Sequence, residues 1–180
     1  MKIAALVGMP GSGKSEVAKV FERNGFFRIR FGDVTDEEVA KRGLPLNESN
    51  ERKIREALRK ELGMAAYAIL NAPKIEAALK NTNVVVDGLY SWEEYLYLKS
   101  KFADSFFVIA VWASPKTRYS RLADRKIRPL TAAEASARDK AEIENVQKGG
   151  PIAMADFTIT NEFSLDSLIK QTEIVVSKIK

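Results

Sequence analysis

The fold of this chain follows from one stretch near its start, Gly8-Met9-Pro10-Gly11-Ser12-Gly13-Lys14-Ser15. Its spacing is G-x-x-x-x-G-K-[ST], the pattern of the phosphate-binding P-loop. The apolar run Ile3–Val7 precedes the stretch, and a segment with helical periodicity, Val17–Asn24, follows it. The motif therefore stands in the strand–loop–helix order that its mechanism requires. The competing interpretation, a glycine-rich turn that carries a lysine by chance, does not account for that order.

In such a loop, glycines let the backbone curl so that successive N–H groups point at phosphate oxygens, aided by the positive end of the following helix. The amino group of Lys14 would reach the β- and γ-phosphates, and the hydroxyl of Ser15 would bind Mg²⁺. The loop thus predicts a nucleoside triphosphate as ligand, bound by every residue from Gly8 to Ser15.

Composition limits the chemistry. The 180 residues are most simply one domain, and 46% hydrophobic with 29% charged residues is ordinary for a globular protein. The chain has no cysteine and no histidine. Disulfide and thiol chemistry are thereby excluded, a zinc site is disfavoured, and any general base is a carboxylate, lysine or tyrosine.

The chain offers no targeting or membrane signal. Its first residues enter a predicted strand rather than a signal peptide, and no apolar run approaches the length of a membrane span. We therefore expect a cytoplasmic protein with no membrane partner. The net charge of +5 fits an anionic ligand and leaves nucleic acid open as a partner.

Five short β-type runs alternate with amphipathic helical patterns along the sequence. This alternation predicts an α/β fold with a parallel sheet covered by helices on both faces. No repeat or linker divides the chain. The runs are Ile3–Val7, Phe26–Phe31, Val84–Asp87, Phe106–Trp112 and Phe157–Thr160.

Capping patterns mark where helices begin. Three of them directly follow a predicted strand, at positions 35, 91 and 114, and so locate the carboxyl ends of those strands, where open α/β sheets bind ligands. We therefore expect the turns Gly32-Asp33 and Asp87-Gly88 to lie beside the P-loop. The patterns are the capping boxes Thr35-x-x-Glu38, Ser91-x-x-Glu94 and Thr131-x-x-Glu134, and the N-cap Ser114 followed by Pro115.

Two aspartates end predicted strands. Asp87 could hold Mg²⁺ or its water together with Ser15, and the compatible alternative is an aspartate of a tight Asp-Gly turn. Asp33 is the best candidate to accept a proton from, or to orient, an acceptor hydroxyl or phosphate, because no histidine is present. The alternative for Asp33 is support of the Thr35 cap from just outside the helix.

Arginines gather after the fourth strand run, at Arg118, Arg121, Arg125 and Arg128. Arg121 and Arg125, at i and i+4, would share one helix face. Arginines delivered by a mobile segment stabilise the charge of a transferring phosphoryl group. The alternative is a solvated basic helix face.

A short helical lid is predicted from these arginines onward. Thr131 starts a new helix that runs through Arg138 to Gly149-Gly150, and these glycines could serve as a hinge. Residues 35–80 form a long helical insertion, where a two-substrate P-loop enzyme would enclose its acceptor. Arg55 and Arg59 could contact an acceptor phosphate there, and a solvated basic face explains them equally well.

The order of these parts resembles the nucleoside monophosphate kinase group of P-loop kinases. It looks most like the adenylate-kinase-related proteins of archaea, with dephospho-coenzyme A kinases as another relative. The resemblance spans almost the whole chain and implies ATP with Mg²⁺, a five-stranded parallel core in a three-layer α/β/α sandwich, and closure around both nucleotides. The pieces that carry it are Gly8–Ser15, Gly32-Asp33, Asp87-Gly88, Arg121-x-x-x-Arg125, Arg138 and 155–161.

The resemblance also implies roles for single residues. Arg121 and Asn161 would contact the adenine, and Arg125 and Arg138 would clamp the transferring phosphate. The chain would divide into a core (1–34, 81–120 and 151–180), an acceptor-side insertion (35–80) and a lid (121–150).

Two positions depart from the adenylate kinase pattern. Asp36 and Ser91 stand where both acceptor-gripping arginines would be. An acidic residue facing an acceptor phosphate repels it, so we predict that AMP is not held in the adenylate kinase manner.

The sequence thus predicts an ATP-dependent kinase of a nucleotide-like small molecule, such as dephospho-coenzyme A. A regulatory nucleotide switch is one alternative, although the chain lacks Asn-Lys-x-Asp and Asp-x-x-Gly. An ATPase acting on RNA or ribosome assembly is the other, supported by the positive charge alone. The sequence does not indicate an oligomeric state.

Overall fold

In a computed structural model, the structure describes residues 1–126 and 129–180, with the side chain of Glu48 left out. Arg128 of the predicted arginine group lies outside the described residues. Five parallel strands form one sheet in the order β2-β3-β1-β4-β5, which confirms the predicted α/β fold. The strands are β1 (Ile3–Val7), β2 (Phe27–Arg30), β3 (Val84–Asp87), β4 (Phe106–Trp112) and β5 (Phe157–Thr160).

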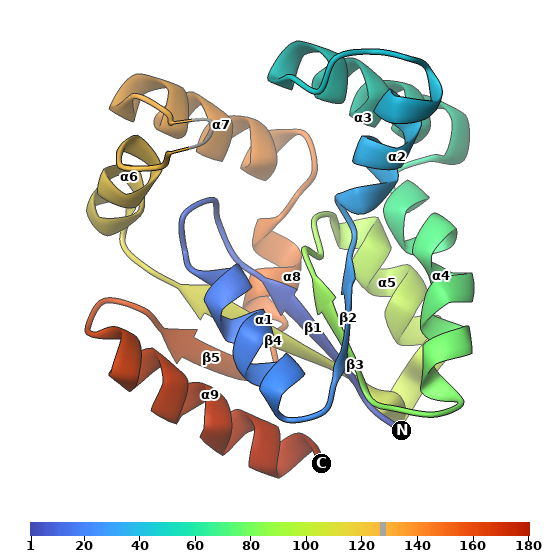
Figure 1. The fold of residues 1–180 in the computed structure, drawn as a ribbon, viewed down its shortest axis with the longest axis vertical. Coiled ribbons are helices and arrows are strands. Elements are labelled where there is room, and N and C mark those ends of the chain that lie inside the picture. The colour runs from blue at the N-terminus through green and yellow to red at the C-terminus, as the bar shows by residue number, and fades with distance from the viewer. Residues whose placement is uncertain (127–128) are drawn as a thin grey trace.

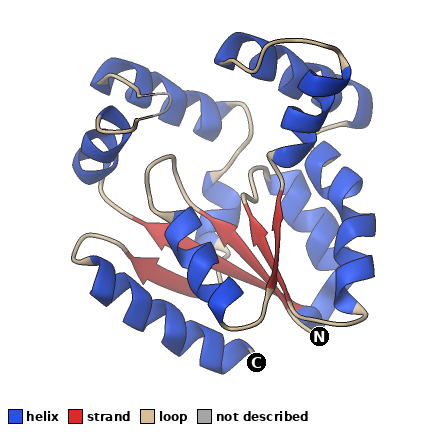
Figure 2. Ribbon diagram, in the orientation of Figure 1, coloured by secondary structure: helices blue, strands red, loops and turns tan. Residues whose placement is uncertain are grey.

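The sheet is the middle of three layers (Figures 1 and 2). Helices α1 (Lys14–Arg23) and α9 (Leu165–Ile179) cover one face. Helices α4 (Ala66–Leu79), α5 (Trp92–Phe102) and α8 (Gly149–Ala153) cover the other, and the short 3₁₀ helix η1 (Ala103–Ser105) leads into β4.

Strand β1 shows why both faces close. Ala4 and Leu6 pack with apolar residues of α1 and α9, whereas Ile3 and Val7 join the opposite apolar cluster. Side chains of a strand alternate between faces, so an all-apolar strand can be buried on both sides. This burial fixes the loop after β1 over the middle of the sheet.

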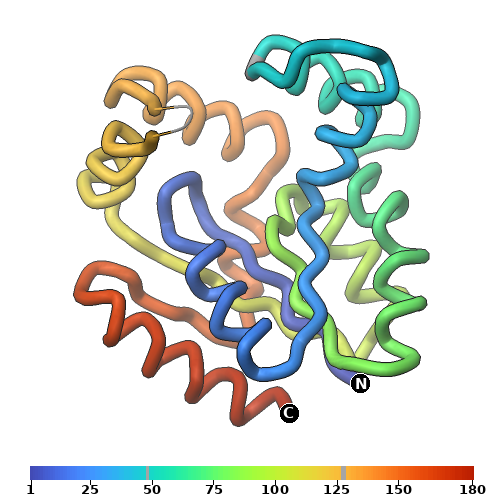
Figure 3. Tube along the Cα trace, viewed as in Figure 1, coloured from blue at the N-terminus to red at the C-terminus, as the bar shows by residue number. Residues whose placement is uncertain are grey.

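Two helical units stand above the carboxyl ends of the strands (Figures 1 and 3). One consists of α2 (Asp33–Lys41) and α3 (Glu48–Leu62), beyond β2. The other consists of α6 (Pro115–Ala123) and α7 (Ala132–Glu144), beyond β4. Of the helices in the described chain, none combines the length and apolarity that crossing a membrane requires.

Three of the four predicted caps are confirmed. Ser91 and Thr131 form reciprocal capping boxes, and the Ser114 hydroxyl accepts from the N–H of Thr117. The box at Thr35 is wrong, because α2 begins two residues earlier, at Asp33. The Thr35 hydroxyl is buried instead and lies 2.5 Å from the hydroxyl of Tyr67 on α4.

Candidate active site

The P-loop connects β1 with α1 above the centre of the sheet. Gly8 and Gly13 have φ angles of 152° and 100°, in the region that favours glycine. A Cβ on Gly8 would meet the carbonyl oxygen of Val111, and one on Gly13 would meet the side-chain amide of Asn161. The glycines are therefore needed both for the turn and for the close approach of β4 and the Asn161 loop.

The loop presents hydrogen-bond donors that the described protein does not use. The N–H groups of Gly13, Lys14 and Ser15 have no acceptor in the described chain, as expected for the first turn of a helix. The hydroxyl of Ser12 is fully buried and also has no partner there. Donors at a helix N-terminus bind anions, so this geometry fits the phosphates of a nucleotide.

Lys14 lies at the centre of a charged cluster. Its amino group donates to the carbonyl oxygens of Gly8 at 2.8 Å and Met9 at 3.2 Å. Burial, and after it the positive charge of Lys148, lower the pKa of Lys14 to about 7. The surroundings of Lys14 therefore favour an added negative charge.

Lys148 is the cation that the sequence analysis missed. It lies between α7 and α8, directly before Gly149, and is only 1% exposed. Its amino group donates to Glu142 at 2.5 Å. Its amino group also lies 4.8 Å from the ring centroid of Tyr90. Nothing in the local sequence marks Lys148, because one of these two partners, Tyr90, lies far away in the chain.

Glu142 forms ion pairs with two cations. It accepts from Lys148 and, at 3.2 Å, from Arg138, which occupies the preceding turn of α7. Burial opposes ionisation of Glu142, but Lys148, Arg138 and Lys14 together lower its pKa to about 2. Glu142 is therefore a counter-ion and a poor proton acceptor. The spacing of Arg138 and Glu142, i and i+4, was the one sequence signal for this group.

Asp87 lies where predicted, at the end of β3, and the sheet register pairs it with Leu6 just before the P-loop. One of its carboxylate oxygens accepts from Arg28 of β2 at 2.5 Å. Arg28 also pairs with Glu22 of α1 at 3.2 Å. The described residues contain no group of three or more metal-ligating side chains. A metal ion here would thus depend on Ser15, Asp87 and the oxygens of a bound ligand.

Asp33, the predicted acceptor contact, is the first residue of α2. Its carboxylate forms an exposed ion pair with Arg30 at 2.8 Å. No hydrogen bond or ion pair among the described residues joins Asp33 to the P-loop. The structure thus places Asp33 beside β2 and does not bring it together with Lys14.

Arg121 and Arg125 border a cavity of about 190 Å³ beside the P-loop, together with Lys14 and Ser15. Arg121 donates to the carbonyl oxygen of Asn161 at 3.0 Å, and one of its nitrogens is buried without a partner. Because α6 ends at Ala123, the predicted i, i+4 helical pair is wrong: Arg125 lies beyond the helix.

Asn161 connects this cavity to the loop. Its side-chain amide donates to the carbonyl oxygen of Ser12 at 2.8 Å. The structure thus brings Asn161, Arg121 and the loop together, as the sequence analysis expected. Gly149 and Gly150 differ from the hinge prediction, because they begin α8, and Gly150 packs against the ring of Trp92.

Arg118 is buried and does not line the cavity that Arg121 and Arg125 border. It is 4% exposed and forms a two-point ion pair with Asp139 of α7, at 2.9 and 2.6 Å. It also donates to the carbonyl oxygens of Pro10 and Ala113, each at 3.1 Å. Arg118 therefore connects the P-loop, the end of β4 and helix α7 to one another.

A second polar group is buried beneath α3. Arg59 lies 5.5 Å from the ring centroid of Tyr67, and its Nε has no hydrogen-bond partner in the described chain. Glu94 is fully buried, and burial raises its pKa to about 7 even though the N–H groups of Tyr90 and Ser91 donate to it. The Ser91 hydroxyl donates to the carbonyl oxygen of Met64 at 2.8 Å, so Ser91 is structural.

The fold and the loop together define the class of this protein, which is that of the P-loop NTPases. Residues 5–149 match the family model described as "AAA domain". The chain belongs to this family and, more narrowly, to the UPF0200 proteins found in archaea.

The sequence relatives match nearly end to end. A UPF0200 protein of Thermococcus kodakarensis is 38% identical, with 98% of this chain and 97% of the relative covered. A UPF0200 protein of Pyrococcus furiosus is 39% identical with the same coverage.

Among solved structures, TT1252 from Thermus thermophilus has a TM-score of 0.68 at 20% identity, covering 99% of this chain and 98% of its own. A gluconokinase from Sinorhizobium meliloti has a TM-score of 0.62 at 15% identity, covering 99% and 93%. A shikimate kinase from Bacteroides thetaiotaomicron also has a TM-score of 0.62, at 14% identity and 98% coverage of both chains. These likenesses establish a kinase-like P-loop fold, and the relation to adenylate kinases stays a prediction.

Proposed function

We propose that this protein is an ATP-dependent phosphotransferase that transfers the γ-phosphate to a small nucleotide-like acceptor. The observation that carries the proposal is the cation cluster over the P-loop. Lys14 comes from the loop, whereas Arg138 and Lys148 come from the lid helix and the turn after it. Phosphoryl transfer is catalysed mainly by positioning and by stabilising charge on the transferring group, which is what such a cluster supplies.

The donor nucleotide would be held from two sides. The free N–H groups of Gly13, Lys14 and Ser15 would bind phosphate oxygens. The Lys14 amino group would exchange its two loop carbonyls for the β- and γ-phosphates. Arg121 and Asn161, which border the loop, would contact the adenine.

The donor site fits Mg²⁺ because Ser15 is exposed at the loop and Asp87 ends the neighbouring strand. Ser15 and the carboxylate oxygen of Asp87 that is not bonded to Arg28 would hold the ion, directly or through water. Mg²⁺ keeps several waters and usually needs only one or two protein ligands, so the lack of a dense acidic group is no obstacle. When bound, it would neutralise charge on the phosphates.

In the transfer step, an acceptor oxygen attacks the γ-phosphorus, and the bond to the oxygen that bridges it to the β-phosphorus breaks. Arg138, Lys148 and Lys14 would stabilise the charge on the transferring group. Contacts to phosphate would compete with Glu142 for the two lid cations, so Glu142 would hold them in place until the nucleotide arrives. Arg125 would join them from beyond α6.

The acceptor would lie between the P-loop and the helices α2 and α3. An acceptor phosphate needs no proton removed before it attacks, whereas for an acceptor hydroxyl Asp33 would take the proton. Arg59, with its unpaired buried Nε, is a candidate contact for acceptor phosphate. Because Ser91 serves as a helix cap and Asp36 is acidic, we do not expect AMP to be held as adenylate kinases hold it.

The test is ADP formation from ATP and Mg²⁺ with a panel of nucleoside monophosphates, dephospho-coenzyme A and small hydroxyl acceptors. The proposal expects acceptor-dependent ADP formation that is lost in Lys14→Ala, because the lysine that contacts the transferring phosphate is then missing. A hydrolysis rate that rises with RNA and with none of the small acceptors would contradict the kinase proposal and favour an RNA-dependent ATPase.

A further inference from the structure

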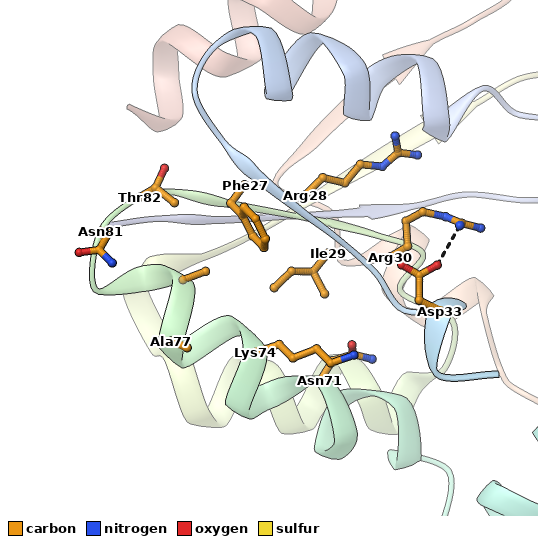
Figure 4. A pocket seen from close by; sticks show the side chains of 11 residues that line it. Phe27, Arg28, Ile29, Arg30, Asp33, Asn71, Lys74, Ala77, Asn81 and Thr82 are labelled. Atoms are coloured by element: carbon orange, nitrogen blue, oxygen red, sulfur yellow. Dashed lines mark ion pairs between the residues drawn. The ribbon is translucent and has the colours of Figure 1, made fainter. Parts of the chain in front are cut away.

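A hollow lies away from the P-loop, between the edge strand β2 and helix α4. It encloses about 600 Å³, within the range of sites for small organic ligands. Figure 4 shows Phe27 and Ile29 on the strand side, with Ala77 and Lys74 on the helix side. We call this space the β2–α4 groove.

The groove has an apolar end that small side chains keep open. Ala77 and Ala78 of α4 face Phe27 and Ile29 across it. Phe27 is 55% exposed, an unusual state for an aromatic ring at a strand. A space with an aromatic ring on one wall and alanines on the other suits an apolar ring system.

A buried hydrogen-bond acceptor is left unused in the wall of the groove. Asn71 is fully buried, and its amide nitrogen donates to the carbonyl oxygen of Tyr67 at 2.9 Å. Its Oδ1 has no partner among the described residues. A buried polar atom without a partner costs free energy, so a ligand that donates a hydrogen bond here would recover that cost.

Near Asn71, the groove also carries positively charged side chains in exposed ion pairs. Lys74 pairs with Glu37 at 2.9 Å, and Arg30 pairs with Asp33 at 2.8 Å. All four side chains are about half exposed, and exposed pairs of this kind contribute little. A ligand anion can therefore take the place of Glu37 beside Lys74. Arg28 extends to the other side of the strand (Figure 4) and pairs with Asp87.

We propose that the β2–α4 groove binds a planar amphipathic anion. This ligand has an apolar ring system between Phe27 and Ala77, a hydrogen-bond donor for Asn71, and an acidic group beside Lys74. A second copy of the chain fits less well, because antiparallel pairing of two β2 edges would bring arginines at positions 28 and 30 opposite one another. The site goes beyond the proposed phosphotransferase activity and would be separate from the P-loop, where ATP would bind.

The experiment uses 8-anilinonaphthalene-1-sulfonate, which combines aromatic rings, one N–H donor and a sulfonate. We expect one probe bound per native chain, by fluorescence titration and calorimetry at low salt. Saturating ATP with Mg²⁺ should leave this binding unchanged. Ala77→Trp should weaken it about tenfold or more by filling the groove. Asn71→Leu should weaken it about threefold to tenfold by removing the acceptor.

Charge is tested by a matched pair of variants, each of which removes the lysine of a Lys–Glu ion pair that involves α4. Lys74→Gln, at the groove, should weaken the probe about threefold. Lys101→Gln removes the partner of Glu76, which is bonded at 2.8 Å outside the groove, and should not affect binding. Thermal unfolding of each variant confirms that it is folded, and the two lysine variants keep the test valid if Asn71→Leu does not fold.

Three results would overturn the proposal. The first is displacement of the probe by ATP, which would place it at the P-loop. The second is equal affinity in the wild-type protein, Ala77→Trp and Lys74→Gln. The third is a dimer, seen by light scattering, that Ala77→Trp or the probe dissociates, because the groove would then be an interface between copies.

Discussion

The amino group of Lys14 must be protonated to bind phosphate, but its surroundings disfavour the positive charge. Burial and the charge of Lys148 lower its pKa to about 7, whereas a phosphate contact needs the protonated amine. Since bound phosphate would raise this pKa again, binding takes up a proton above about pH 7. In the free protein, the unfolded chain holds more protons than the native one between pH 7 and the ordinary lysine pKa of 10.5, so Lys14 makes native stability rise with pH over that window.

We therefore predict that ATP affinity falls as pH rises from 7.5 to 9.5, by up to about tenfold per pH unit. Lys14→Arg should remove most of this dependence, because an arginine stays charged throughout the range. Calorimetry in buffers of different ionisation enthalpy measures the proton uptake directly. A wild-type affinity that is independent of pH would contradict a low pKa for Lys14.

Lys148 allows a second test among the charged residues. If Lys148 contacts the γ-phosphate, Lys148→Met should weaken the affinity for ATP by about tenfold or more, because a charge-assisted hydrogen bond is lost. The affinity for ADP, which lacks the γ-phosphate, should change little. Lys140→Met is the matched control, because that lysine lies on the preceding helix α7 and pairs loosely with Glu144 at 3.9 Å, with both side chains exposed. It should alter neither nucleotide.

Removing Lys148 alone leaves the buried negative charge of Glu142 without one of its ion-pair partners, which destabilises the fold. The double variant Lys148→Met with Glu142→Gln removes both charges and separates the two effects. Equal losses of ATP and ADP affinity in a double variant that unfolds like the wild type would contradict a γ-phosphate contact.

At the scale of elements, the lid is held to the P-loop by the pair Arg118–Asp139, both about nine-tenths buried. Breaking such a pair leaves an uncompensated buried charge. We predict that Asp139→Ala costs about 3 kcal/mol or more and lowers the Tm by about 6 °C or more. The exposed pair Arg52–Glu56 serves as control, and Arg52→Ala should leave the Tm unchanged. A Tm for Asp139→Ala within about 2 °C of the wild type would show that the lid is held by packing alone.

What the sequence could predict depends on how local each signal is. The P-loop, the strands and the caps at Ser91, Ser114 and Thr131 were predictable because each is fixed by residues within a few positions. Thr35 was misassigned since it matches the same local pattern, while its hydroxyl is used by Tyr67, a residue of a later helix. Helix α2 begins two residues before the position that the capping pattern predicts.

The charged pairs were beyond sequence reasoning for the same reason. Arg28 meets Asp87 across 59 positions, and Arg118 meets Asp139 across 21. No periodicity connects partners that different elements bring together. Lys148 was missed because its importance lies in its burial, and lysines are ordinarily exposed. The acceptor contacts stay predictions for a related reason, since Asp33 and Arg59 belong to helices whose arrangement the strand order does not fix.

At the scale of the whole molecule, the P-loop lies between two helical units that share few cross-contacts with each other (Figure 1). A nucleotide that touches the loop, Arg121 and Arg138 joins the core to the lid, and so stabilises the native state as one body. We predict that ATP with Mg²⁺ at 100 times its Kd adds about 2.7 kcal/mol. For a chain of this size, that corresponds to a Tm rise of about 5 to 11 °C.

The same measurement can identify the acceptor. A true acceptor binds on the α2–α3 side, so it should raise the Tm further when added to a non-hydrolysable ATP analogue, and should do so less when added alone. Dephospho-coenzyme A and AMP are the two to compare, because Asp36 and Ser91 lead us to expect little from AMP. Lys14→Ala should lose the rise caused by the analogue. If AMP gives the larger additional rise, the acceptor is gripped by residues other than those the adenylate kinase pattern uses, and Arg59 becomes the first residue to replace.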